Sequence, residues 1–172
     1  MRVTLNRRLA SIGDTVLRYA LYLLLNPIKE RFRTCIHSTA GLVIKAGGSA
    51  LVKTGSAVCH LTVKGKNRRI AGSTDMPALV GTVTNAMHNL YVFTIDGSGT
   101  TYVQMGTEAA AEASVKWPSL NPERAIIGYI KVNPTGTGNF VGGTTVLDDV
   151  TVVPNVAYIS PVGMFDPTAA ID

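Results

Sequence analysis

Apolar residues in the first 33 positions recur at steps of three and four, which is the spacing of one face of an α-helix. This face carries Leu5, Leu9, Ile12, Val16, Leu17, Ala20, Leu23 and Leu24. The polar side carries Arg7, Arg8, Asp14 and Arg18. Asn26-Pro27 is expected to end or kink this helix, because the residue before proline avoids the α region, and Pro27 can open a short second helical turn. The pattern predicts a helical basic arm over residues 1–34.

The pattern changes after Cys35, where no helical period survives and Gly, Thr and Val become frequent. Turn signals then arrive about every 8–12 residues, a spacing typical of small antiparallel β domains. We expect three hairpins, which pair 41–45 with 49–53, 58–63 with 68–72, and 89–95 with 100–105. The third has the clearest turn, Asp96-Gly97-Ser98-Gly99.

The second half of this region is expected to be less regular. Residues 124–132, RAIIGYIKV, form a nearly continuous apolar run, which predicts a strand buried on both faces. Weaker strands are expected at 139–141, 144–147 and 156–159. Residues 106–122 are expected to form an ordered loop with at most two helical turns. The predicted fold class is therefore mainly β, with a small antiparallel β-sandwich or barrel over residues 35–172 preceded by the N-terminal α-helical arm.

The charge is distributed unevenly along the 172 residues, although the net charge is only +5. Residues 1–71 contain 13 basic and two acidic residues, a net charge of +11. Residues 72–172 contain three basic and nine acidic residues, a net charge of −6. Such asymmetry favours a binding partner for one half over an enzyme pocket.

The N-terminal arm does not carry the pattern of a membrane span or a clear signal peptide. Its longest purely apolar run, residues 19–25, is far shorter than the ~20 residues that a span needs. Asp14 and Arg18 interrupt the apolar stretch that a signal peptide would require. The arm can pack on its own β domain or on symmetry mates, lie on a membrane surface, or dock onto another protein, and the sequence leaves these alternatives open.

Cysteine and histidine spacing indicates no metal site. Cys35 and Cys59 favour two buried free thiols, although a bridge between them stays open in an oxidising compartment. With His37 and His60 they supply two cysteines and two histidines, but the spacing fits no zinc-finger pattern. His88 lies far from the others. We therefore expect no metal and no cofactor.

The carboxylates do not form a recognisable catalytic pair. Asp148 and Asp149 are neighbours, so in a strand they would point to opposite faces and in a turn they would simply be solvated. Glu108 and Glu112 lie one helical turn apart among alanines, with no aromatic platform for a sugar. The sequence also has neither a Gly-x-Ser-x-Gly elbow nor a phosphate loop. We expect no catalytic residue, and the protein is predicted not to be an enzyme.

Four positive charges cluster on one predicted hairpin, at Lys64, Lys66, Arg68 and Arg69. Nucleic-acid binding normally adds stacking aromatic side chains or a helix that enters a groove, and no aromatic residue flanks this hairpin. The cluster therefore favours a solvated turn or contact with an acidic protein surface over nucleic acid.

Four motifs in order resemble a module of tailed-bacteriophage virion structural proteins. They are the aromatic strand and turn LYVFTIDGSGT (90–100), the Gly-Thr-Glu at 106–108, the strand IIGYIKV (126–132), and the loop NFVGGTTVLD (139–148). The resemblance covers roughly residues 57–160 and leaves out the helical arm. It is a resemblance to head-fibre, capsid-decoration and tail-fibre components, which are typically trimeric.

The resemblance implies a non-enzymatic protein of the virion, assembled in the host cytoplasm. We expect a homotrimer that decorates the capsid and docks on the major capsid protein, or on another virion protein, through its basic N-terminal half. The alternatives are a tail-associated or fibre-base protein and a nucleic-acid-binding protein that uses the basic half. The residues predicted to anchor the protein are Arg2, Arg7, Arg8, Arg18, Arg31 and Arg33, followed by Lys64, Lys66, Arg68 and Arg69.

Overall fold

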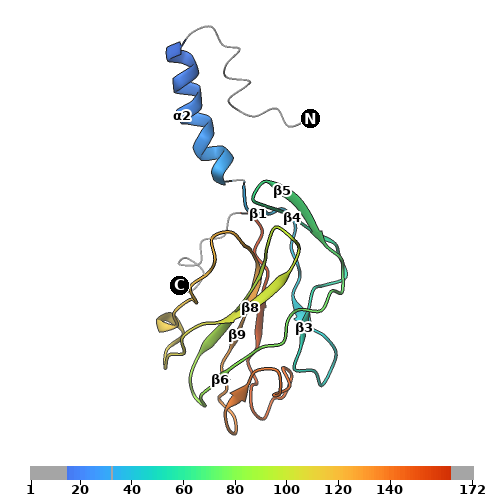
Figure 1. Cartoon of the computed structure of the whole chain (residues 1–172). Helices are drawn as coiled ribbons and strands as arrows, with labels where there is room; N and C mark the ends of the chain where they lie inside the picture. Colours follow the sequence, from blue (N-terminus) through green and yellow to red (C-terminus); the bar gives the residue numbers. More distant parts are fainter. Residues whose placement is uncertain (1–14, 32, 164–172) are drawn as a thin grey trace.

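The protein is mainly β, with one helix that stands away from a set of antiparallel sheets (Figure 1). The computed structural model describes residues 15–31 and 33–163, with side chains for 15–25 and 33–163. The helix α2 spans Thr15–Arg31. The predicted fold class is confirmed, and the sheets of the described residues are sandwich-like rather than closed into a barrel. The part of the predicted helical arm before Thr15 lies outside the described residues.

A four-stranded antiparallel sheet forms the centre of the domain. Its strand order is β11 (Ala157–Ile159), β9 (Ala125–Val132), β7 (Asn89–Ile95) and β8 (Thr101–Met105). Every residue of β7 is buried, and β9 is buried on both faces as its apolar run predicted.

The hairpin of β7 and β8 is confirmed, and its turn is built around Asp96. The Asp96 carboxylate accepts hydrogen bonds from the backbone N–H groups of Ser98, Gly99 and Thr100. An Asx side chain that binds the turn in this way fixes where the chain reverses. The Asp-Gly signal in the sequence therefore placed the strands on either side of it correctly.

A three-stranded sheet has the order β1 (Cys35–Ile36), β4 (Cys59–Val63) and β5 (Lys66–Ile70). The β4–β5 hairpin is confirmed, but its turn is shorter than expected. Lys64 and Gly65 have φ angles of +50° and +71°, the positive values of a two-residue type I′ turn, which matches the twist of paired strands. Lys66 and Asn67, which were expected in the turn, consequently belong to β5.

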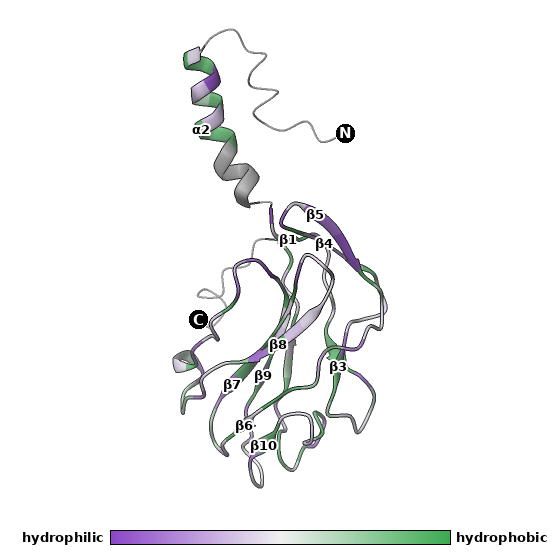
Figure 2. Ribbon diagram, viewed as in Figure 1, coloured by the Kyte–Doolittle hydropathy of each residue, from purple (hydrophilic) through white to green (hydrophobic). Residues whose placement is uncertain are grey.

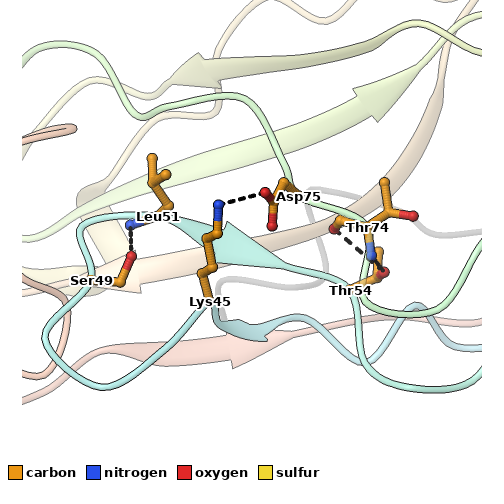
Figure 3. Close-up of polar contacts among 6 residues, drawn as sticks. All are labelled: Lys45, Ser49, Leu51, Thr54, Thr74 and Asp75. Atoms are coloured by element: carbon orange, nitrogen blue, oxygen red, sulfur yellow. Dashed lines mark hydrogen bonds and ion pairs between the residues drawn. The ribbon is translucent and has the colours of Figure 1, made fainter.

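Two short pairs complete the sheets: β2 (Val43–Ile44) with β3 (Val52–Lys53), and β6 (Thr82–Val83) with β10 (Phe140–Val141). The β2–β3 hairpin was predicted, and polar contacts hold the following chain segment beside it (Figure 3). Lys45 Nζ contacts Asp75 Oδ2 at 2.6 Å, and the backbone N–H of Thr54 donates to the Thr74 carbonyl at 2.9 Å.

One expectation is wrong. Residues 144–147 form a turn and not a strand, because the N–H groups of Thr144 and Thr145 both donate to the Val141 carbonyl and curl the chain. Of the two alternatives for Asn26-Pro27, the helix does not end there: it continues to Arg31 and includes the helical turn expected after Pro27. A proline inside a helix removes one backbone hydrogen bond, which is tolerable in an exposed helix because water can bind the freed carbonyl.

The main hydrophobic core draws on both halves of the sequence, since Leu61 and Ile70 pack in one cluster with Phe93, Ile127 and Phe140. The basic and acidic halves of the sequence therefore do not form two separate bodies.

The outer face of the four-stranded sheet has its own cover, the 106–122 stretch. Val115 and Trp117 pack there on Leu90, Val92 and Tyr129. This stretch is the predicted ordered loop, with a single 3₁₀ turn, η1 (Glu112–Ser114).

Candidate docking surface

The apolar stripe predicted on the helix faces solvent. Val16, Leu23 and Leu24 of this face are 79%, 54% and 63% exposed, and Tyr19, which was not part of the predicted face, extends the stripe and is 65% exposed. No residue of Thr15–Leu25, the part of α2 whose side chains the structure describes, belongs to either hydrophobic cluster. Figure 2 shows the apolar bands of α2 outside the β domain. Of the alternatives for the arm, packing of the described helix against its own β domain is therefore not what the structure shows.

The composition of α2 adds to this picture. Between Thr15 and Leu25 its one charged residue is Arg18, and its first turn holds no acidic residue. A helix with apolar side chains over most of its surface is normally covered by other groups. No helix of the described chain has the length and hydropathy to cross a bilayer.

The joint between α2 and the β domain is fixed by the β4–β5 turn. The backbone N–H of Gly65 donates to the Arg33 carbonyl at 2.7 Å, and the N–H of Lys64 donates to Thr34 Oγ1 at 3.3 Å. The tight β4–β5 turn thus directs two backbone N–H groups at the segment that follows the helix, and these N–H groups bind it. The predicted basic hairpin lies at the base of the predicted arm.

The four hairpin cations do not form one free patch. Lys64 forms an ion pair with Glu123, and an Arg68 N–H donates to the Gly97 carbonyl in the β7–β8 turn. Lys66 and Arg69 are exposed to solvent. Half of the cluster therefore holds β5 to neighbouring segments, and half is available to a partner. Figure 2 shows β5 as a hydrophilic strand.

The other predicted anchoring residues lie along the arm. Arg18 is partly buried on α2, and Arg33 is exposed at the joint. Arg31 is the last residue of α2, and its side chain lies outside the described part. Arg2, Arg7 and Arg8 also lie outside the described residues.

Three of the four carboxylates considered for catalysis, those of Glu108, Asp148 and Asp149, stabilise local structure through hydrogen bonds. Glu108 accepts hydrogen bonds from the N–H and the hydroxyl of Thr84, each at 2.8 Å. Asp148 accepts the N–H of Gly48. The Thr151 hydroxyl and N–H donate to Asp149 and hold its pKa below the usual range. These carboxylates fix turns, and their hydrogen-bonding capacity is partly used.

The cysteines and histidines do not converge. Cys35 and Cys59 are buried and free, as favoured from the sequence. His37 Nε2 lies 2.6 Å from Thr62 Oγ1, and His60 is exposed on β4. Within the described ranges, no three His, Cys, Asp or Glu side chains are grouped so as to hold a metal ion.

One feature was not indicated by the sequence, a cavity of about 310 Å³ on the outer face of the four-stranded sheet. It is lined by His88, Asn89, Leu90, Glu112, Val115, Lys131, Val132, Asn133, Asn155 and Ala157. These residues come from four separate parts of the chain, so no local spacing could have revealed them.

No protein-family model, curated protein or solved structure matches this chain.

Proposed function

We propose that this protein is a non-enzymatic structural component of a phage virion, held on the capsid by α2 and presenting its β domain to solvent. The observation that carries the proposal is the exposed apolar stripe of α2 outside the β domain. The four motifs that resemble virion modules, which occur in the same order, support a place in the virion. Of the two positions considered there, we propose the capsid first and the tail as the alternative.

Burial of the apolar stripe against a partner can supply a large part of the free energy of binding. Full burial of one Val, Leu or aromatic side chain contributes roughly 1.5–3 kcal/mol. Association costs roughly 4–15 kcal/mol in lost freedom, so burial of several such side chains is needed. Full burial of Val16, Tyr19, Leu23 and Leu24 would together contribute roughly 6–12 kcal/mol, which is comparable to this cost, so further contacts must add to the net affinity.

Charge orients the contact. Arg18 on α2, with Lys66 and Arg69 near the base of the arm, favours a groove with apolar walls and acidic rims. Charges at a rim mainly affect the association rate and orientation and are screened by salt, whereas the apolar contact persists.

The direct test is co-sedimentation with capsids assembled without the protein, which compares the full chain with a form containing residues 34–172. That form keeps all of the residues in the two hydrophobic clusters. We expect it to lose binding. Equal binding by the shorter form would overturn the proposal.

A point variant separates loss of the stripe from loss of the segment. Leu23→Asp places a charge in the stripe and should abolish co-sedimentation. Val150→Asp is the matched control, because Val150 is an exposed apolar residue of the β domain, 74% accessible. It should bind like the unmodified chain. Sedimentation velocity on the same samples tests the expected homotrimer.

Salt dependence distinguishes this function from nucleic-acid binding. Binding to duplex DNA through several phosphate contacts falls steeply with salt, by about 10³–10⁵ between 50 and 200 mM for six to ten contacts. Capsid binding through α2 should change far less. Salt-sensitive DNA binding together with no capsid binding would favour the nucleic-acid alternative.

A further inference from the structure

The cavity on the outer face lies where three strands meet η1. Leu90 of β7 pairs with Lys131 of β9, and Lys131 pairs with Ala157 of β11. Directly paired residues share a face of the sheet, so these three side chains lie on the outer face. η1 brings Glu112 and Val115 to the same place.

An ion pair contributes the strongest polar groups. Lys131 Nζ donates to Glu112 Oε1 at 2.6 Å, and the two side chains are 28% and 51% exposed. This contact uses one carboxylate oxygen and one of the three ammonium N–H groups. A second oxygen and further N–H groups are left for a ligand, with a donor and an acceptor next to each other.

Beside this ion pair, the polar lining consists of the imidazole of His88 and the amide side chains of three asparagines. Asn133 and Asn155 each carry an amide that donates and accepts hydrogen bonds. Because the charges of Glu112 and Lys131 balance each other, this pair gives the cavity little preference for an ion of either sign. Adjacent donors and acceptors without net charge match vicinal hydroxyl groups, since each hydroxyl also donates and accepts.

The remaining lining is apolar and comes from Leu90, Val115, Val132 and Ala157. Such side chains suit the C–H face of a sugar ring. The volume, about 310 Å³, lies at the small end of the ~300–1,000 Å³ range of ligand pockets. We propose that this cavity binds a neutral saccharide unit, one or two rings in size, through vicinal hydroxyl groups held by Glu112 and Lys131.

The lining favours binding over hydrolysis. Glycoside hydrolysis ordinarily uses two carboxyl groups that flank the bond, about 5–9.5 Å apart. Glu112 is the single carboxylate among the lining residues. It is also engaged by Lys131, whose hydrogen bond holds its pKa below the usual range and keeps it a charged acceptor.

The cavity is remote from the arm. Thr34, which follows α2, and Ala125, at the start of β9, line one common small cavity. Lys131 lies six residues further along β9, about 20 Å away at the rise of a strand. Saccharide binding therefore does not depend on the proposed anchoring, and each can fail without the other.

The test is an NMR titration of the full ¹⁵N-labelled chain with four methyl glycosides, those of D-glucose, D-galactose, D-mannose and N-acetyl-D-glucosamine. At least one should shift backbone resonances around Leu90, Glu112, Lys131 and Asn155. Glu112→Gln and Lys131→Met should each weaken that binding by about tenfold or more, because each removes a charged hydrogen-bonding group.

The matched control is Asp75→Asn. It removes the ion pair of Lys45 with Asp75, which has the same 2.6 Å contact on another part of the surface (Figure 3). Its saccharide affinity should equal that of the unmodified chain. The proposal is overturned by no response to any glycoside, by shifts that persist unchanged in both cavity variants, or by a stronger response to sodium acetate or tetramethylammonium chloride.

Discussion

The helix α2 and the strand β7 are both rich in apolar residues, yet they lie in opposite environments. All seven residues of β7 are buried, and Tyr91 and Phe93 are completely shielded from solvent. In α2, by contrast, Leu23 and Leu24 are more than half exposed. Apolar content alone therefore does not distinguish a core element from an element whose apolar side chains face solvent. The difference lies in whether another segment of the described chain packs on it.

The largest expected effect tests this difference by truncating one side chain on each element. Phe93→Ala should reduce the free energy of unfolding by about 3–5 kcal/mol, because it leaves a cavity in the core. Leu23→Ala should change it by less than about 0.5 kcal/mol, as expected for an exposed position. Guanidinium chloride denaturation measures both. A large loss in the α2 variant would mean that the helix packs on the β domain in solution.

A smaller effect is the pH dependence of stability, which we expect from the β domain and not from α2. Hydrogen bonds from the Ser98 hydroxyl, from the N–H of Thr100 and from the Tyr102 hydroxyl hold the pKa of Asp96 well below its usual value of 3.8. As the pH falls, the Asp96 carboxylate consequently takes up a proton more readily in the unfolded chain than in the folded protein. The stabilisation is present above pH 3.8 and is lost progressively as the pH falls below that value.

The variant Asp96→Asn isolates this contribution. Its denaturation midpoint should be lower than that of the unmodified chain at about pH 7, and the gap should narrow at about pH 2.5. Because Asp96 lies in the β domain, the substitution should not alter the helical circular dichroism signal of α2 in the folded protein. A gap of constant size at both pH values would contradict the assignment.

The smallest effect concerns the surface ion pair of the β2–β3 region. Asp75→Asn should lower the free energy of unfolding by less than about 1 kcal/mol, because both Lys45 and Asp75 are substantially exposed and water competes for their contact. Thermal denaturation at low and high salt measures it, and the difference from the unmodified chain should shrink as salt screens the pair. A loss comparable to that of Phe93→Ala would contradict this view.

The elements that were predicted correctly have strong local signals. The β7–β8 hairpin combines an aromatic-rich apolar strand with an Asp-Gly turn, and the hydrogen bonds of Asp96 in that turn show why the signal is reliable. The strand at 144–147 was wrong because residues that favour strands, such as Thr145 and Val146, do not reveal that two N–H groups bind the Val141 carbonyl. The strand β6 was missed because two residues are too short to show a period.

The candidate sites were predicted less completely than the fold. Periodicity identified which residues of α2 share a face, but it carries no information about what covers that face. The four hairpin cations were found, although their division between Glu123, Gly97 and solvent depends on segments far away in the sequence. The cavity beside Glu112 and Lys131 was missed because it is assembled by strand register, which brings Lys131 beside Leu90.

The two buried thiols allow local opening of the structure to be measured by chemical modification. Cys35 lies on β1 and Cys59 on the neighbouring β4, and both are closed off from solvent. Burial raises the pKa of the Cys59 thiol, so that the unreactive protonated form predominates at neutral pH. An alkylating reagent can therefore modify these positions at an appreciable rate only when the local structure separates. The rate of alkylation consequently measures how often β1 and β4, at the end of the β domain nearest α2, separate. No label has to be added to the chain.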